Sequence, residues 1–211
     1  MSAALIVIAK APVPGRVKTR LCPPCTPRQA AALAEAALRD TLRAAVAARG
    51  PVRRVVALEG EPGDWLPAGF DLVSQRGAGL AERLAAAFDD VGGPALLIGM
   101  DTPQVTPALL DRALARLALG DAVFGPARDG GYWAIGLRRP DRRVFDGVPM
   151  SVETTGAVQR RRLAELGLSV VDLPALRDVD TIADAQAVAA AAPAGRFAEQ
   201  LHAVEPLVAA A

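Results

Sequence analysis

The chain has 211 residues, of which 52% are hydrophobic and 22% are charged, and its formal net charge is +1. This balance disfavours a basic track for nucleic acid, and no apolar run reaches the roughly 20 residues that a membrane span needs. The length and apolar content predict one domain over residues 1–211 with a substantial core. The short N-terminal apolar stretch has no basic flank, so we expect a cytoplasmic protein.

Apolar runs bounded by turn residues alternate along the chain with Ala- and Leu-rich segments of helical period. This alternation is typical of an α/β sandwich with a mainly parallel sheet. The expected strands are 5–9, 53–58, 71–74, 95–98, 122–125, 132–137 and 168–171. The expected helices are 27–49, 79–91, 107–119 and 153–166, with one more opened by 178–184. Thr26 and Thr106, each followed by proline, are expected to cap the helices that they precede.

The loop after the first strand is strongly basic: it contains several lysines and arginines, and no acidic residue precedes Glu35. Both lysines of the chain lie in this loop, whereas every other basic residue is arginine. A compact ammonium suits a phosphate oxygen, so the loop is predicted to bind phosphate. It has neither the Walker nor the dinucleotide-binding glycine pattern. The predicted nucleotide or phosphate ligands are Lys10, Gly15, Arg16, Lys18 and Arg20.

Carboxylates follow two later strands. In an open α/β sheet, ligands bind beyond the carboxyl ends of the strands, so these loops are candidate site segments. Asp101 can hold a divalent cation that bridges phosphate oxygens, or it can cap the turn into the next helix. Asp178 and Asp180 alternate in an extended segment and can offer a second ligand, or they can belong to a helix cap with Asp184. We favour a functional role for Asp180 over Asp178.

Two other loops have weaker signals. The turn Asp129, Gly130, Gly131 and Tyr132 is predicted to bind an acceptor, with Trp133 beside it, although a plain hairpin explains the turn almost as well. The loop 75–83 contacts either a base or the acceptor, or is only a helix start.

Classical nucleophilic catalysis is not supported by the sequence. Cys22 and Cys25 form a Cys-Pro-Pro-Cys segment that favours reduced cytoplasmic thiols over a redox pair or half a zinc site. The single histidine, His202, lies near the other end of the chain. Neither a Ser-His-Asp nor a Cys-His arrangement is credible, which leaves metal-assisted transfer.

Four ordered motifs together resemble the bacterial DUF2064 family, also labelled rSAM/selenodomain-associated transferase 1. They are residues 9–21, 98–103, 125–132 and 178–184. The family lies in the GT-A nucleotide-diphospho-sugar transferase superfamily, so the resemblance implies a three-layer, Rossmann-like GT-A sandwich. It also implies that Asp101 and Asp180 hold a catalytic Mg²⁺ or Mn²⁺. Met150-Ser151 stands where the family usually has Trp-Ser.

The segment 18–21, Lys-Thr-Arg-Leu, is similar to one in phospholactate and phosphoenolpyruvate guanylyltransferases of the same superfamily. We therefore expect a Mg²⁺-dependent transferase in which Lys18, Asp101 and Asp180 act catalytically. Nucleotidyl transfer from a nucleoside triphosphate to a small phosphorylated or acidic acceptor fits four loop cations best. Glycosyl transfer from a nucleotide-diphospho-sugar is the alternative, and a non-catalytic nucleotide-binding module is the second. A homodimer is compatible with the sequence.

Overall fold

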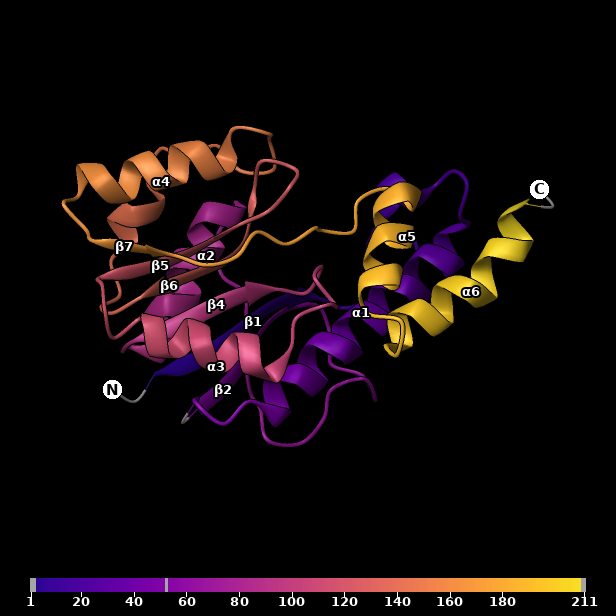
Figure 1. The fold of residues 1–211 in the computed structure, drawn as a ribbon, viewed down its shortest axis with the longest axis horizontal. Coiled ribbons are helices and arrows are strands. Elements are labelled where there is room, and N and C mark those ends of the chain that lie inside the picture. Colours follow the sequence, from indigo (N-terminus) through magenta and orange to yellow (C-terminus); the bar gives the residue numbers. More distant parts are fainter. Residues whose placement is uncertain (1–2, 52, 210–211) are drawn as a thin grey trace.

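The computed structural model describes residues 3–51 and 53–209 (Figure 1). Its centre is a seven-stranded sheet in the order β3-β2-β1-β4-β6-β5-β7. Among the described strands, only β6 runs antiparallel to its neighbours, so the predicted mainly parallel α/β sandwich is confirmed. The strands are β1 (Ala4–Lys10), β2 (Arg53–Glu59), β3 (Asp71–Ser74), β4 (Ala95–Gly99), β5 (Ala122–Pro126), β6 (Tyr132–Leu137) and β7 (Val170–Asp172).

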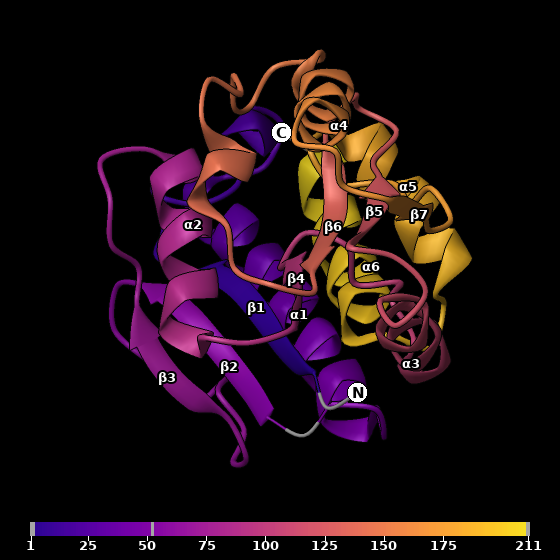
Figure 2. The same cartoon turned by 90° about the vertical axis from the view of Figure 1, so that its left-hand side faces the viewer.

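Helices cover both faces of the sheet (Figures 1 and 2). The α-helices are α1 (Pro27–Ala47), α2 (Leu80–Val91), α3 (Pro107–Arg116), α4 (Thr155–Glu165), α5 (Ile182–Ala191) and α6 (Arg196–Ala209), and two 3₁₀ turns are η1 (Thr19–Leu21) and η2 (Arg142–Phe145). Helices α1 and α3 pack on one face, α2 and α4 with η2 pack on the other, and α5 and α6 pack against α1. None of the described helices is both long and apolar enough to cross a bilayer.

The two cores follow from the period of two in the strands. In β1, Leu5 and Val7 belong to the core under α1 and α3, whereas Ala4 and Ile6 belong to the core under α2. Successive side chains of a strand point to opposite faces, so a strand covered on both faces is apolar at nearly every position. The helices therefore bury β1 almost completely, and only its last residue, Lys10, is exposed.

The predicted caps are confirmed, and helices α1 and α3 end earlier than predicted. Thr26 and Thr106 each accept a backbone N–H from the third helical residue. Helix α1 ends at Ala47 rather than at residue 49, because Arg54 donates to three of the last carbonyls and Asp111 accepts from the N–H groups of residues 49 and 50. Helix α3 ends at Arg116 and continues only as turns.

Helix α6 is not anticipated by the sequence patterns. It follows Gly195, which has no side chain to serve as a cap. The buried carboxylate of Asp40 in α1 takes that role, since it accepts the N–H groups of Arg196 (3.1 Å) and Phe197 (2.9 Å). An acidic group at a helix N-terminus is favoured by the helix dipole. The cap therefore comes from a residue that is distant in sequence.

The segment 173–181 lies along the carboxyl ends of the strands. Its Leu176 forms a parallel bridge with Ala127, and its Val179 N–H donates to the Asp101 carbonyl oxygen (3.1 Å). These backbone contacts fix the segment over the ends of β4 and β5. Residues from both halves of the chain therefore meet at one edge of the sheet.

Candidate functional site

A cleft of about 1300 Å³ opens at the carboxyl ends of β1 and β4. Its walls include the basic loop, the start of α2, the turn between β5 and β6, residues 150–155 and the segment 173–181. The predicted site residues that line it are Lys10, Arg16, Lys18, Arg20, Asp101, Asp129, Gly131, Tyr132 and Asp180. Gly15 and Gly130 are not among the lining residues, and both have a left-handed backbone (φ 77° and 90°) that shapes the loops.

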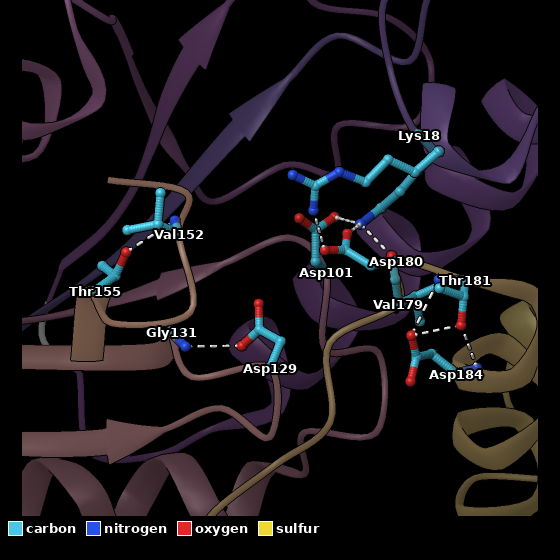
Figure 3. A network of polar contacts seen from close by, with 11 residues as sticks. Lys18, Asp101, Asp129, Gly131, Val152, Thr155, Val179, Asp180, Thr181 and Asp184 are labelled. Atoms are coloured by element: carbon cyan, nitrogen blue, oxygen red, sulfur yellow. Dashed lines mark hydrogen bonds and ion pairs between the residues drawn. The ribbon is translucent and has the colours of Figure 1, made fainter. Parts of the chain in front are cut away.

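Lys18 is the centre of the polar network in the cleft (Figure 3). Its Nζ lies 2.9 Å from Asp101 Oδ1 and 3.5 Å from Asp180 Oδ1, and it donates to the Val179 carbonyl oxygen at 2.5 Å. The side chain is only 9% exposed. Burial disfavours its charged form, but the charge of Asp101 and a hydrogen bond to it, together with Asp180, raise the pKa of Lys18. The ammonium is therefore firmly charged.

The other basic residues have separate partners. Arg20 donates to Asp180 Oδ2 at 2.8 Å, so two cations share that carboxylate. Lys10 pairs with Glu59 at 3.3 Å, on the β2 side of the cleft. Arg16 is exposed, and among the described residues no ion-pair partner faces it. The structure thus brings Lys18 and Arg20 to the carboxylates and leaves Lys10 and Arg16 on the rim.

Asp178 also lines the cleft, beside the Asp180 that the sequence favoured over it. Its Oδ1 is buried without a hydrogen-bond partner among the described residues. Burial, with repulsion from the charges of Asp101 and Asp129, raises the pKa of Asp178 to about 7. The alternation with Asp180 was the only signal for it in the sequence. By contrast, Asp184 forms the capping box of α5 with Thr181, so its role there is structural.

A raised carboxyl pKa implies that stability falls with pH. The neutral form of Asp178 is favoured in the folded state, so its stabilising effect is complete below its ordinary pKa of 3.8 and is lost as the pH rises through about 7. We expect Asp178→Asn to raise the Tm of the ligand-free protein, by several degrees more at pH 7.5 than at pH 5. Thermal melts at both pH values test this; an equal difference at the two pH values would contradict it.

The turn between β5 and β6 is held against the start of α4. The Gly156 N–H donates to the Gly130 carbonyl oxygen at 2.8 Å, and a Cβ on Gly130 would lie 2.0 Å from the Glu153 carbonyl oxygen. The Asp129 carboxylate accepts the Gly131 N–H at 2.9 Å (Figure 3). Helix α4 starts at Thr155, two residues later than predicted. The N–H of its second residue, Gly156, bonds to this hairpin instead of to the preceding residues of the chain.

Tyr132 and Trp133 differ in their surroundings. The Tyr132 hydroxyl donates to Gln159 Oε1 at 3.3 Å, its ring packs on Phe124, and burial raises the pKa of Tyr132. Tyr132 is therefore a neutral, anchored wall of the cleft. Trp133 is only 2% exposed and donates to the Pro174 carbonyl oxygen, so it mainly fixes the segment 173–181.

The donor set fits a hard divalent cation. Asp101 and Asp180 flank one ammonium closely enough to share a single cation, and carboxylate oxygens suit Mg²⁺ or Mn²⁺. Within the described residues, no three His, Cys, Asp or Glu side chains form a ready-made metal group. Mg²⁺ is commonly held by one or two carboxylates together with substrate phosphates. The arrangement therefore suits a cation that arrives with a phosphorylated ligand.

Comparisons with known proteins agree with this geometry. Residues 32–152 match the model of a bacterial family described as "Uncharacterized protein conserved in bacteria (DUF2064)". A crystal structure from Desulfovibrio desulfuricans, provisionally described as a nucleotide-diphospho-sugar transferase, is 28% identical with a TM-score of 0.86, covering 99% of this chain and 97% of that one. No curated protein matches the sequence.

Two more distant structures share the fold. The CMP:2-keto-3-deoxy-manno-octonic acid synthetase complexed with CTP is 14% identical with a TM-score of 0.58, covering 90% of this chain and 98% of that one. The Mycobacterium tuberculosis protein Rv0371c in complex with manganese is 22% identical with a TM-score of 0.50, covering 89% and 98%. At these identities the likeness concerns the fold alone.

Proposed function

Since the chain belongs to the bacterial DUF2064 family, we propose that it is a metal-dependent transferase that acts on a nucleotide as one domain. The observation that carries this proposal is the cluster of Lys18, Asp101 and Asp180 at the floor of the cleft, beside a basic loop. The fold shared with a CTP-bound synthetase and a manganese-bound protein supports it.

The charge of the cleft supports a metal-bound nucleotide over a bare anion. Five basic and six acidic side chains line it, so the cleft has no net positive formal charge to attract a triphosphate. A bound Mg²⁺ or Mn²⁺ would neutralise charge on the phosphate oxygens. Asp101 and Asp180 would hold that ion, while Lys18, Arg16 and Arg20 would bind the phosphates. Lys10 would add a further cation to this phosphate-binding loop. Gly15, which has no side chain, would let the backbone of the loop come close to the phosphates.

We favour nucleotidyl transfer as the reaction. An oxygen of a small phosphorylated or acidic acceptor would bond to the α-phosphorus, and the bond from that phosphorus to the bridging oxygen of the β-phosphate would break, releasing pyrophosphate. Charge builds on the phosphate oxygens during such a step, and positioned cations stabilise it. Asp129, Gly130, Gly131 and Tyr132 would position the acceptor, with residues 150–155 forming the facing wall.

Glycosyl transfer is the second candidate, because the Desulfovibrio structure described as a nucleotide-diphospho-sugar transferase is similar over nearly the whole chain. In that reaction the acceptor oxygen would bond to the anomeric carbon of the sugar, and a nucleoside diphosphate would leave. The same aspartates and cations would stabilise the leaving diphosphate.

Ligand stabilisation separates the two reactions. We expect GTP, CTP or ATP with Mg²⁺ to raise the Tm by several degrees, because a ligand at a hundred times its Kd stabilises a protein by about 2.7 kcal/mol. UDP-sugars and GDP-sugars with Mg²⁺ should shift it less. Differential scanning fluorimetry measures both; stabilisation by a nucleotide sugar alone would favour glycosyl transfer, and a shift by neither would argue against nucleotide binding.

A further inference from the structure

The ammonium of Lys18 has a complete set of partners within the protein itself. An ammonium has three N–H donors, and two carboxylate oxygens and one carbonyl oxygen surround this one. Lysine side chains are seldom buried, but the Lys18 side chain is only 9% exposed. In the ligand-free protein, the ammonium that is expected to bind phosphate is therefore already paired with two carboxylates and a carbonyl oxygen.

The same oxygens are those that the proposed metal ion needs. Asp101 Oδ1 and Asp180 Oδ1 lie 2.9 and 3.5 Å from the Lys18 Nζ, so one cation already occupies the space between them. A second cation would meet strong repulsion there unless the ammonium withdrew, because two like charges about 4 Å apart repel each other even at the effective dielectric of a protein surface. Arg20 on the other oxygen of Asp180 adds to this repulsion.

We propose that Lys18 is a built-in counter-ion that competes with the divalent cation for Asp101 and Asp180. The protein alone then binds the metal weakly, and an anion that takes over the ammonium strengthens metal binding. The inference rests on the proposed function, because it concerns the same two aspartates. It assigns Lys18 a second role, the coupling of metal binding to phosphate binding.

The backbone at Lys18 is consistent with a side chain placed for this contact. Lys18 has a left-handed conformation (φ 49°, ψ 38°) at the start of η1, a region that is unfavourable for residues with a Cβ. Such strain persists where the surrounding contacts compensate for it. The four-carbon side chain leaves the ammonium free to swing to a phosphate without moving that backbone.

Coupling of this kind acts in both directions. If phosphate binding raises the metal affinity by some factor, metal binding raises the phosphate affinity by the same factor. The competition therefore disfavours a protein loaded with metal alone or phosphate alone, and favours the loading of both together. A lysine that served only as a structural ion pair would produce no such coupling.

Mn²⁺ binding to the ligand-free protein tests the proposal without nucleotide or acceptor. Electron paramagnetic resonance of free Mn²⁺ gives the Kd of the wild type, Lys18→Met and Lys18→Gln. We expect both neutral variants to bind Mn²⁺ at least about tenfold more tightly, because removal of the ammonium removes the competitor. Circular dichroism melts identify whichever variant is folded, and either one is sufficient.

Lys10→Met is the matched control. It removes an ammonium from the rim of the same cleft, but one that pairs with Glu59 instead of the aspartates. Its Mn²⁺ affinity should change by less than about threefold. Lys18 variants that bind Mn²⁺ no more tightly than the wild type, or no more tightly than Lys10→Met, would overturn the proposal.

Sulfate, which complexes Mn²⁺ only weakly, tests the coupling. Added sulfate should tighten Mn²⁺ binding several-fold in the wild type and leave the Lys18 variants unchanged; equal effects on all would overturn the coupling. Because this experiment contains no nucleotide, its failure would leave the proposed transfer reaction standing. Conversely, a lack of nucleotide binding would not alter the Mn²⁺ result.

Discussion

Asp101→Asn is expected to lower metal-dependent turnover by roughly 10²–10³-fold, the scale found when one preorganised electrostatic contact to a reacting centre is removed. The amide keeps the shape of the side chain but loses the charge that a divalent cation needs. The assay is the release of pyrophosphate or nucleoside diphosphate from the nucleotide that stabilises the protein most. The variant should also need more Mn²⁺ for half-maximal rate.

The folded state should tolerate this change. The Asp101 side chain is 40% exposed, and exposed ion pairs contribute about 0–1 kcal/mol. Lys18 keeps its contacts with Asp180 and the Val179 carbonyl oxygen. Asp184→Asn is the control, because Asp184 lies on the same cleft but caps α5. Unchanged turnover in Asp101→Asn would remove Asp101 from the mechanism, and unchanged Mn²⁺ dependence would remove it from the metal site.

Gly130→Ala is expected to destabilise the protein by about 2–4 kcal/mol, which corresponds to a Tm lower by roughly 4–16 °C. Two effects add at this position. The backbone φ of 90° is strained for any residue with a Cβ, and the new Cβ would lie 2.0 Å from the backbone carbonyl oxygen of Glu153. The hairpin and the start of α4 would have to separate, so turnover should fall as well.

Gly147→Ala isolates the strain from the collision. Gly147 has a φ of 73°, but its added Cβ would have no atom within 4 Å. Its expected cost is about 1 kcal/mol, from the left-handed backbone alone. Equal losses of Tm in the two variants, measured by calorimetry, would show that the contact between the hairpin and α4 contributes nothing.

Local signals predicted the elements that are capped locally. Thr26 and Thr106 each precede proline and lie within a turn of the groups that they bond, so the starts of α1 and α3 were readable. Helix α6 was not, because its cap is Asp40, a residue 156 positions from Arg196. The end of α1 depends similarly on Asp111, which is distant in sequence. Patterns of adjacent residues carry no information about such partners.

The site shows the same division. Residue types and strand ends indicated Lys18, Asp101 and Asp180, and the fold brings these three together. The hydrogen bond from Lys18 to the Val179 carbonyl oxygen was not predictable, because every residue has a backbone carbonyl and the residue type does not indicate which one is used. The pairing of Lys10 with Glu59 was not visible either, since it depends on the register of β1 against β2.

The segment 173–181 has a consequence for the order in which the molecule assembles. Val179 and Asp180 contact residues of the first loop that are about 160 positions away, so their contacts close one of the longest loops in the chain. Long-range contacts of this kind form only after the entropy of loop closure has been overcome. We therefore expect the candidate site to be completed late in folding, so that a partly folded chain would have the basic loop without Asp180, the aspartate that pairs with Lys18 and Arg20.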